Sequence, residues 1–230
     1  MNKFTFRYFP SRLTAEEEAL DNKIFRYSLV IPILFLVIFW MVKLAEIMLD
    51  VRFIQWGVYP RQLDGLRGIV LSPLVHADFS HLAGNSASFF VLALALFYFY
   101  RKVAMRVFVF NYFLSGALLW IDGRESWHVG ASGIIYGLAA FLFFSGLFRR
   151  DIRLLSISLI VTFLYGGFLW GLFPTDSAIS WEGHLSGAAS GTLLSFLYRK
   201  YGPPLPDYES EDSETDNDEN EDTPHPIPEQ

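Results

Sequence analysis

Residues 130–148 read GASGIIYGLAAFLFFSGLF, an apolar stretch of the length that a helix needs to cross a lipid bilayer. Further stretches qualify or nearly qualify, so the predicted spans cover residues 28–48, 82–100, 103–121, 132–148, 154–172 and 184–199. None alternates strictly between apolar and polar residues, as a strand of a membrane barrel would. Because only helices and closed barrels satisfy their backbone groups in lipid, we predict an all-α polytopic membrane protein, a bundle of six transmembrane helices.

The composition of the chain also places it in the membrane class. Of its 230 residues, 52% are hydrophobic and 17% are aromatic, which is too apolar for a soluble domain of this length. The sequence contains no Cys, which excludes disulfide bonds and every metal or nucleophile site that depends on cysteine.

The formal net charge of −6 comes from one end of the chain. Residues 207–229 carry 11 acidic side chains and no Lys or Arg, whereas residues 1–206 carry 18 basic and 13 acidic side chains. A segment of such composition cannot bury an apolar core, so we predict that it is disordered. The predicted organisation is a cytosolic N-terminal segment over 1–27, a six-helix membrane domain over 28–201 and an acidic disordered cytosolic tail over 202–230.

Basic residues predict which way the bundle lies in the membrane. One side is rich in Lys and Arg, among them Lys23, Arg26, Arg101, Lys102, Arg106, Arg149, Arg150, Arg153, Arg199 and Lys200. The opposite side carries only Arg52, Arg61, Arg67 and Arg124. The positive-inside rule then places both termini in the cytoplasm. It follows that Ser132, His184, His76 and His81 lie near the extracytoplasmic ends of their segments, where they can share one site.

A hydroxyl and an imidazole in lipid-embedded chain indicate chemistry, because polar groups at membrane depth are costly. Ser132 begins the fourth predicted span, where unpaired backbone N–H groups favour developing negative charge. Gly130 and Gly133 let the backbone approach a substrate carbonyl closely. Histidine, with an ordinary pKa of about 6.5, is the usual base for a serine nucleophile, and His184 begins the sixth span. Without His184, the Gly-Ala-Ser-Gly string would favour simple helix packing.

Small residues predict how the two spans meet. Gly187 and Gly191 follow His184 at a spacing that lets two membrane helices touch, so we expect span six to pack on span four. Tyr136 lies one turn after Ser132 on the same helix face, where its ring can pack against the imidazole.

His81 and Asn85 lie four residues apart on one face of the second span. An imidazole N–H and an amide aimed at one point are suitable donors for a tetrahedral oxyanion, together with the Ser132 backbone N–H. One alternative is that these are polar residues at a helix end, with Asp78 or Ser80 as the N-cap. Another is a zinc site formed by His76, His81 and His184, which is disfavoured because no carboxylate or cysteine completes the set.

Taken together, the His76/His81/Asn85 string, Gly130-Ala-Ser132-Gly133 and Gly183-His184 with Gly187 and Gly191 resemble the rhomboid family of intramembrane serine proteases. The resemblance covers about residues 50–200, and Gly183 departs from the Ala that many members carry there. It implies a six-helix bundle with a Ser–His dyad that lacks the third acid of soluble serine proteases.

The same resemblance implies roles for individual residues. Ser132 would be the nucleophile, His184 the general base, His81 and Asn85 the oxyanion donors, and Tyr136 the ring that orients His184. His76 would have only a local structural or hydrogen-bonding role. Two residues, Trp170 and Phe173, are candidates for a substrate gate.

The predicted function is therefore cleavage of single-span membrane proteins in or near their transmembrane segment, from the extracytoplasmic side. We expect no cofactor, no metal and no nucleic-acid partner, and a location in a bacterial plasma membrane. The alternatives are a non-catalytic relative that binds membrane-protein clients and a histidine-lined transporter of metal ions or protons. No catalytic role is expected for four other polar residues. His128 is expected to line the entrance, Glu182 to be interfacial, and Arg106 and Asn111 to snorkel and make helix contacts.

Overall fold

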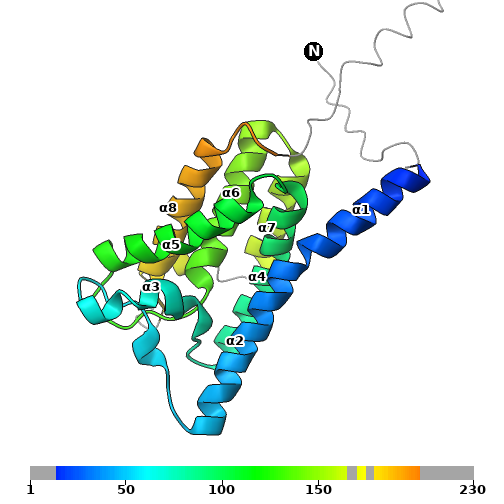
Figure 1. The fold of residues 1–230 in the computed structure, drawn as a ribbon. Coiled ribbons are helices and arrows are strands. Elements are labelled where there is room, and N and C mark those ends of the chain that lie inside the picture. The colour runs from blue at the N-terminus through cyan, green and yellow to red at the C-terminus, as the bar shows by residue number, and fades with distance from the viewer. Residues whose placement is uncertain (1–13, 165–169, 175–178, 203–230) are drawn as a thin grey trace, which may run out of the picture.

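The computed structural model describes residues 14–164, 170–174 and 179–202, and this part of the chain is dominated by helices (Figure 1). The α-helices are α1 (Ala15–Ser28), α2 (Val30–Leu49), α3 (Gly68–Leu71), α4 (Phe79–Phe99), α5 (Ala104–Asp122), α6 (Ser132–Arg149), α7 (Ile152–Leu164) and α8 (Trp181–Leu197). Short 3-10 turns are η1 (Ile54–Trp56), η2 (Leu63–Gly65), η3 (Ser72–Leu74) and η4 (Trp170–Leu172).

The predicted membrane class is confirmed by the length and composition of these helices. Among the described residues, four helical segments are long and apolar enough to cross a membrane: Ala15–Leu49, Phe79–Phe99, Ala104–Asp122 and Ser132–Arg149. Helix α8 has 17 residues and α7 has 13, which is short of the roughly 20 that a span needs. Part of the fifth predicted span, 165–169, lies outside the described residues, so the count of six spans stays a prediction.

The first predicted span, 28–48, corresponds to α2, and a helix precedes it. The preceding helix α1 begins at Ala15, and the backbone stays helical through Leu29 into α2. Thr14 and Glu17 form a capping box, which explains where the helix starts. The hydropathy of the sequence located only the apolar helix α2, because a polar helix such as α1 gives no hydropathy signal. Figure 1 shows α1 and α2 as one long helix at the edge of the bundle.

Helices α4, α5 and α6 surround the core. Its fully buried side chains include Phe89, Leu92, Leu96, Phe141 and Leu142, and α2 contributes Phe39. Helix α2 is otherwise much less covered than α4 or α6, because only 17% of its most apolar window is buried. It therefore presents most of its surface to the surrounding lipid.

Glycines set the close contact between α6 and α8. A Cβ atom at Gly187 would overlap the carbonyl oxygen of Gly133, and one at Gly191 would overlap that of Gly137. The predicted packing of span six on span four is thus confirmed. On another side of α6, the Asn111 amide of α5 donates to the carbonyl of Ile134 at 3.0 Å, which confirms the helix contact expected for Asn111.

Helices α4, α6 and α8 all begin at one end of the bundle, which we call the Ser132 end. The long loop 50–78 and the loop 123–131 meet there through an isolated antiparallel bridge between Val58 and His128. The Gly130 N–H also donates to the Ser72 carbonyl at 2.9 Å. These backbone bonds fix the two loops around the start of α6.

Candidate active site

Ser132 is the first residue of α6, directly after the N-cap Ala131. Its neighbour Gly133 lies against α8, since a Cβ there would be 3.2 Å from the Gly183 carbonyl oxygen. The residues next to Ser132 and His184 are therefore in contact. Within the described part of the chain, no hydrogen bond joins the Ser132 hydroxyl to the imidazole. In enzymes without substrate, such bonds are often long and tighten only in the complex.

The His184 imidazole is held in a defined orientation. Its Nδ1 lies 2.7 Å from the backbone carbonyl oxygen of Gly171, and its ring stacks on Tyr136 with centroids 4.1 Å apart and 9° between planes. A carbonyl can only accept, so Nδ1 carries the proton and Nε2 keeps a free lone pair. The side chain is 9% exposed. The arrangement presents a neutral imidazole that can take up a proton at Nε2.

Gly171 is a site residue that the sequence analysis missed. A Cβ atom there would overlap the Tyr136 hydroxyl and lie 2.9 Å from His184 Nδ1. Its contribution is a backbone carbonyl, which leaves no side-chain signature apart from the glycine itself. Of the two suggested gate residues, Phe173 is 55% exposed, and the Trp170 side chain lies outside the described part of the structure.

His81 and Asn85 lie on the first two turns of α4, against Gly130. A Cβ atom at Gly130 would lie 2.5 Å from His81 Cε1 and 3.2 Å from Asn85 Nδ2, and its φ of +112° also favours glycine. Asn85 is 8% exposed, and its Nδ2 has no hydrogen-bond partner among the described residues. A buried amide donor without a partner is unusual and calls for an explanation.

The start of α4 distinguishes between the two caps that the sequence allowed. The Asp78 carboxylate, and not Ser80, accepts the His81 N–H at 2.8 Å. This hydrogen bond to the His81 backbone lowers the pKa of Asp78, which keeps the cap ionised.

His76 is packed into the protein interior at 2% exposure. Its ring lies between Phe39 and His81, with centroid distances of 5.2 and 5.3 Å, and neither ring nitrogen has a hydrogen-bond partner among the described residues. Burial, followed by the nearby His81, lowers the pKa of His76 to about 3, and the Leu74 backbone offsets only part of this shift. His76 is therefore a neutral packing residue at ordinary pH.

His128 connects the two loops to the start of α8. Its Nε2 faces the Arg124 carbonyl at 3.0 Å, so Nε2 donates and Nδ1 accepts from the Ser180 hydroxyl at 2.6 Å. Burial lowers the pKa of His128, which favours this neutral form. Glu182 is 8% exposed and lies 3.6 Å from the Arg124 guanidinium, and its interfacial role stays a prediction.

A cavity with an empty volume of about 400 Å³, including its open mouth, adjoins Ser132. It lies between α5, α6 and η3, and polar groups line it, among them Ser72, Tyr112, Ser115, His128, Ser132 and Ser180. A small polar cavity of this kind can hold water. No group of three His, Cys, Asp or Glu side chains in the described residues is arranged to hold a metal ion, so the three-histidine zinc alternative gains no support.

The fold and this site define an all-α integral membrane protein in which Ser132, His184, His81 and Asn85 lie at the same end of the bundle. Residues 64–201 match the family model of the Rhomboid domain. The chain is 33% identical over 180 residues to the uncharacterized protein Rv1337 of Mycobacterium tuberculosis, covering 71% of this chain and 72% of that one. It is 32% identical to the uncharacterized protein ML1171 of Mycobacterium leprae, over 71% and 68% of the two chains.

A third relative carries a functional name. Over 130 residues the chain is 37% identical to the Bacillus subtilis protein "Putative rhomboid protease YdcA", which covers 54% of this chain and 63% of that one. The chain belongs to the rhomboid family, a family of intramembrane proteases. The relatives named here are all bacterial.

Proposed function

We propose that this protein is an intramembrane serine endopeptidase in which Ser132 is the nucleophile and His184 the general base. The observation that carries the proposal is the orientation of the His184 imidazole. Its Nδ1–H donates to the Gly171 carbonyl, and the stacked Tyr136 ring fixes the plane of the imidazole. This leaves Nε2 to accept a proton, on a helix whose first turn touches the first turn of α6.

The proposed reaction begins with attack of the Ser132 oxygen on the substrate carbonyl carbon. The hydroxyl proton passes to His184 Nε2, and the carbonyl oxygen becomes an oxyanion. The unpaired Asn85 amide, the His81 ring and the Ser132 backbone N–H are the proposed donors to that oxyanion, and Gly130 leaves room for the carbonyl beside them.

The second half of the reaction requires water at a site surrounded by helices. Protonated His184 gives its proton to the leaving amine, which breaks the C–N bond and leaves an ester on Ser132. Water then attacks this ester and transfers a proton to His184 Nε2. The C–O bond to Ser132 breaks, His184 returns the proton to the Ser132 oxygen, and the acid product leaves. The polar cavity beside Ser132 is the proposed source of the water.

The proposed substrates are single-span membrane proteins cut in or near their transmembrane segment, by a six-span enzyme in a bacterial plasma membrane. Both termini are proposed to be cytoplasmic, on the ground of the Lys and Arg distribution. Because the chain has no Cys, Ser80→Cys can be labelled alone with a membrane-impermeant maleimide. Labelling in intact cells agrees with this orientation, and labelling only after lysis contradicts it.

The central test is cleavage of a single-span substrate by purified protein in liposomes. We expect Ser132→Ala and His184→Ala to lower the rate at least about 1,000-fold, because each removes half of a unit that acts together. The matched control is Ser126→Ala, a serine in the adjoining loop that is expected to keep cleavage within about 3-fold. Wild-type cleavage by Ser132→Ala would exclude Ser132 as the nucleophile. Absence of cleavage by the unmodified protein would favour the transporter or client-binding alternatives.

A further inference from the structure

Helix α2 carries a pair of charged side chains that the proposed reaction does not use. Lys43 and Glu46 lie 2.9 Å apart near its C-terminal end, with side chains 12% and 6% exposed. Removing an ion pair from water is costly, and the attraction between the charges often fails to recover that cost. Charged residues in membrane helices are therefore rarely present for stability alone.

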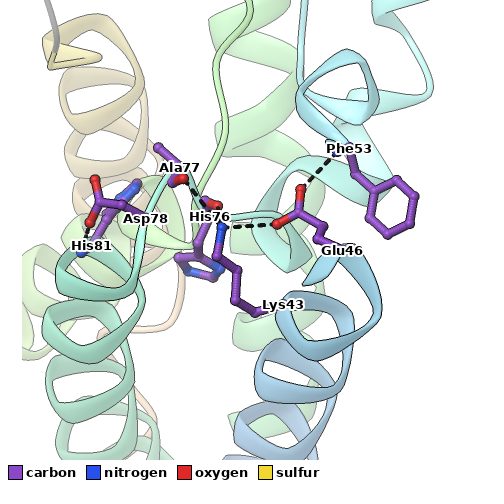
Figure 2. Close-up of polar contacts among 7 residues, drawn as sticks. All are labelled: Lys43, Glu46, Phe53, His76, Ala77, Asp78 and His81. Atoms are coloured by element: carbon purple, nitrogen blue, oxygen red, sulfur yellow. Dashed lines mark hydrogen bonds and ion pairs between the residues drawn. The ribbon is translucent and has the colours of Figure 1, made fainter. Parts of the chain in front are cut away.

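The contacts of the pair lead away from α2 (Figure 2). The Lys43 ammonium donates to the backbone carbonyls of His76 at 3.0 Å and Ala77 at 3.2 Å, besides pairing with Glu46. All three of its N–H donors thus have acceptors. The other oxygen of Glu46 accepts the Phe53 backbone N–H at 2.7 Å, which fixes the first residues of the long loop.

The two carbonyls that Lys43 holds come immediately before the start of α4. The next residue, Asp78, caps the helix by accepting the His81 N–H, and the His76 ring packs on the His81 ring. A displacement of this segment would therefore move the first turn of α4. His81 lies on that turn, against Gly130.

We infer that Lys43 and Glu46 are positioning residues that set the place of His81 beside Gly130. Glu46 orients the ammonium, the ammonium fixes the peptide before α4, and that peptide fixes the His81 backbone and ring. The inference rests on the proposed function, in which His81 donates to the oxyanion. The pair touches neither Ser132 nor His184 in any contact that the described structure contains.

The test variant is Lys43→Met with Glu46→Gln, which removes both charges together and keeps an acceptor for the Phe53 N–H. We expect kcat for a single-span substrate to fall about 10- to 100-fold with KM within about 2-fold, because one lost oxyanion donor costs about 100- to 1,000-fold. The matched control is Lys102→Met with Glu18→Gln, which neutralises two exposed side chains and is expected to keep kcat within about 2-fold.

A double-mutant comparison separates positioning from general damage. In a His81→Ala background, the Lys43/Glu46 change should lower kcat by less than about 3-fold, because the group it positions is already absent. The same loss in both backgrounds overturns the inference. If the double variant does not fold, Glu46→Gln alone replaces it, with an expected loss of about 3- to 10-fold that again disappears in His81→Ala.

A distance measurement tests the inference without reference to activity. Spin labels at Ser80→Cys and Glu125→Cys, introduced in a chain with no other Cys, report the first turn of α4 relative to the loop before Ser132. We expect the distance distribution to broaden in the Lys43/Glu46 variant and not in its control; an unchanged distribution overturns the inference. Because this readout needs no catalysis, it stays decisive even if Ser132→Ala cleaves normally and the proposed function fails.

Discussion

At the scale of residues, the base of the proposed dyad is oriented without an acid. In soluble triads a carboxylate accepts the Nδ1 proton and stabilises the imidazolium that forms. Here the acceptor is the neutral Gly171 carbonyl, and the face of the ring is covered by Tyr136. A carbonyl dipole avoids burying another charge beside the site, which would be costly in a membrane protein.

The clearest residue-scale prediction concerns Gly171→Ala. The added methyl group would overlap the Tyr136 hydroxyl and press on His184 Nδ1, so the ring must move. We expect kcat to fall about 100-fold, the size of loss that a misplacement of about 1 Å produces. The matched control is Gly84→Ala, where a Cβ meets nothing within 4 Å. Equal kcat values for the two variants would contradict the role given to Gly171.

At the scale of elements, the pairing of α6 with α8 determines whether the site exists. Gly187 and Gly191 of α8 rest directly on the carbonyls of Gly133 and Gly137 of α6. This close approach of two backbones brings together the helix starts that carry Ser132 and His184. Larger side chains at Gly187 or Gly191, in the contact between α6 and α8, would separate the proposed nucleophile from its base.

The element-scale prediction is made with Gly187→Ala. The new Cβ would overlap the Gly133 carbonyl oxygen, and overpacking of this kind costs about 1–3 kcal/mol. We expect a lower thermal midpoint in detergent together with loss of cleavage. Ala189→Leu adds more volume to an exposed position of the same helix and should change neither quantity. A Gly187→Ala protein with the wild-type thermal midpoint and cleavage rate would show that α6 and α8 can move apart without loss of function.

At the scale of the whole molecule, buried histidines make folding stability depend on pH. The folded-state pKa of His76 is about 3, against 6.5 for a free imidazole. Below pH 6.5 this histidine binds a proton in the unfolded chain but not in the folded protein. The free energy of unfolding is therefore not reduced by His76 above that pH, and it falls as the pH drops toward 3. His128 acts in the same direction, because burial lowers its pKa too.

We therefore predict a lower thermal midpoint at about pH 5 than at about pH 7.5. At the lower pH His76 alone should remove about 2 kcal/mol, since one pKa unit corresponds to about 1.4 kcal/mol. His76→Phe, which keeps an aromatic ring beside Phe39, should show a smaller difference between the two pH values. An equal difference in both proteins would mean that His76 is not the titrating group.

Much of this architecture could be predicted from local pattern. Apolar runs located α4, α5 and α6 to within a few residues, because burial in lipid demands apolar length. The helix-packing role of Gly187 and Gly191 could also be predicted, since it depends on residues close together in the chain. Hydropathy located α2 but not the helix α1 before it, because polar helical turns carry no hydropathy signal.

What the sequence by itself determined is the membrane class, the family motifs and the candidate chemical groups, because these follow from residue type and short spacing. Only the tertiary structure decided which groups meet: Gly171 under His184, His128 against Ser180, and Lys43 on the carbonyls before α4. These contacts join segments far apart in the chain through backbone atoms or single side chains. Backbone atoms are common to every residue, and these single side chains form no recognisable sequence motif. Only the folded structure therefore shows the contacts.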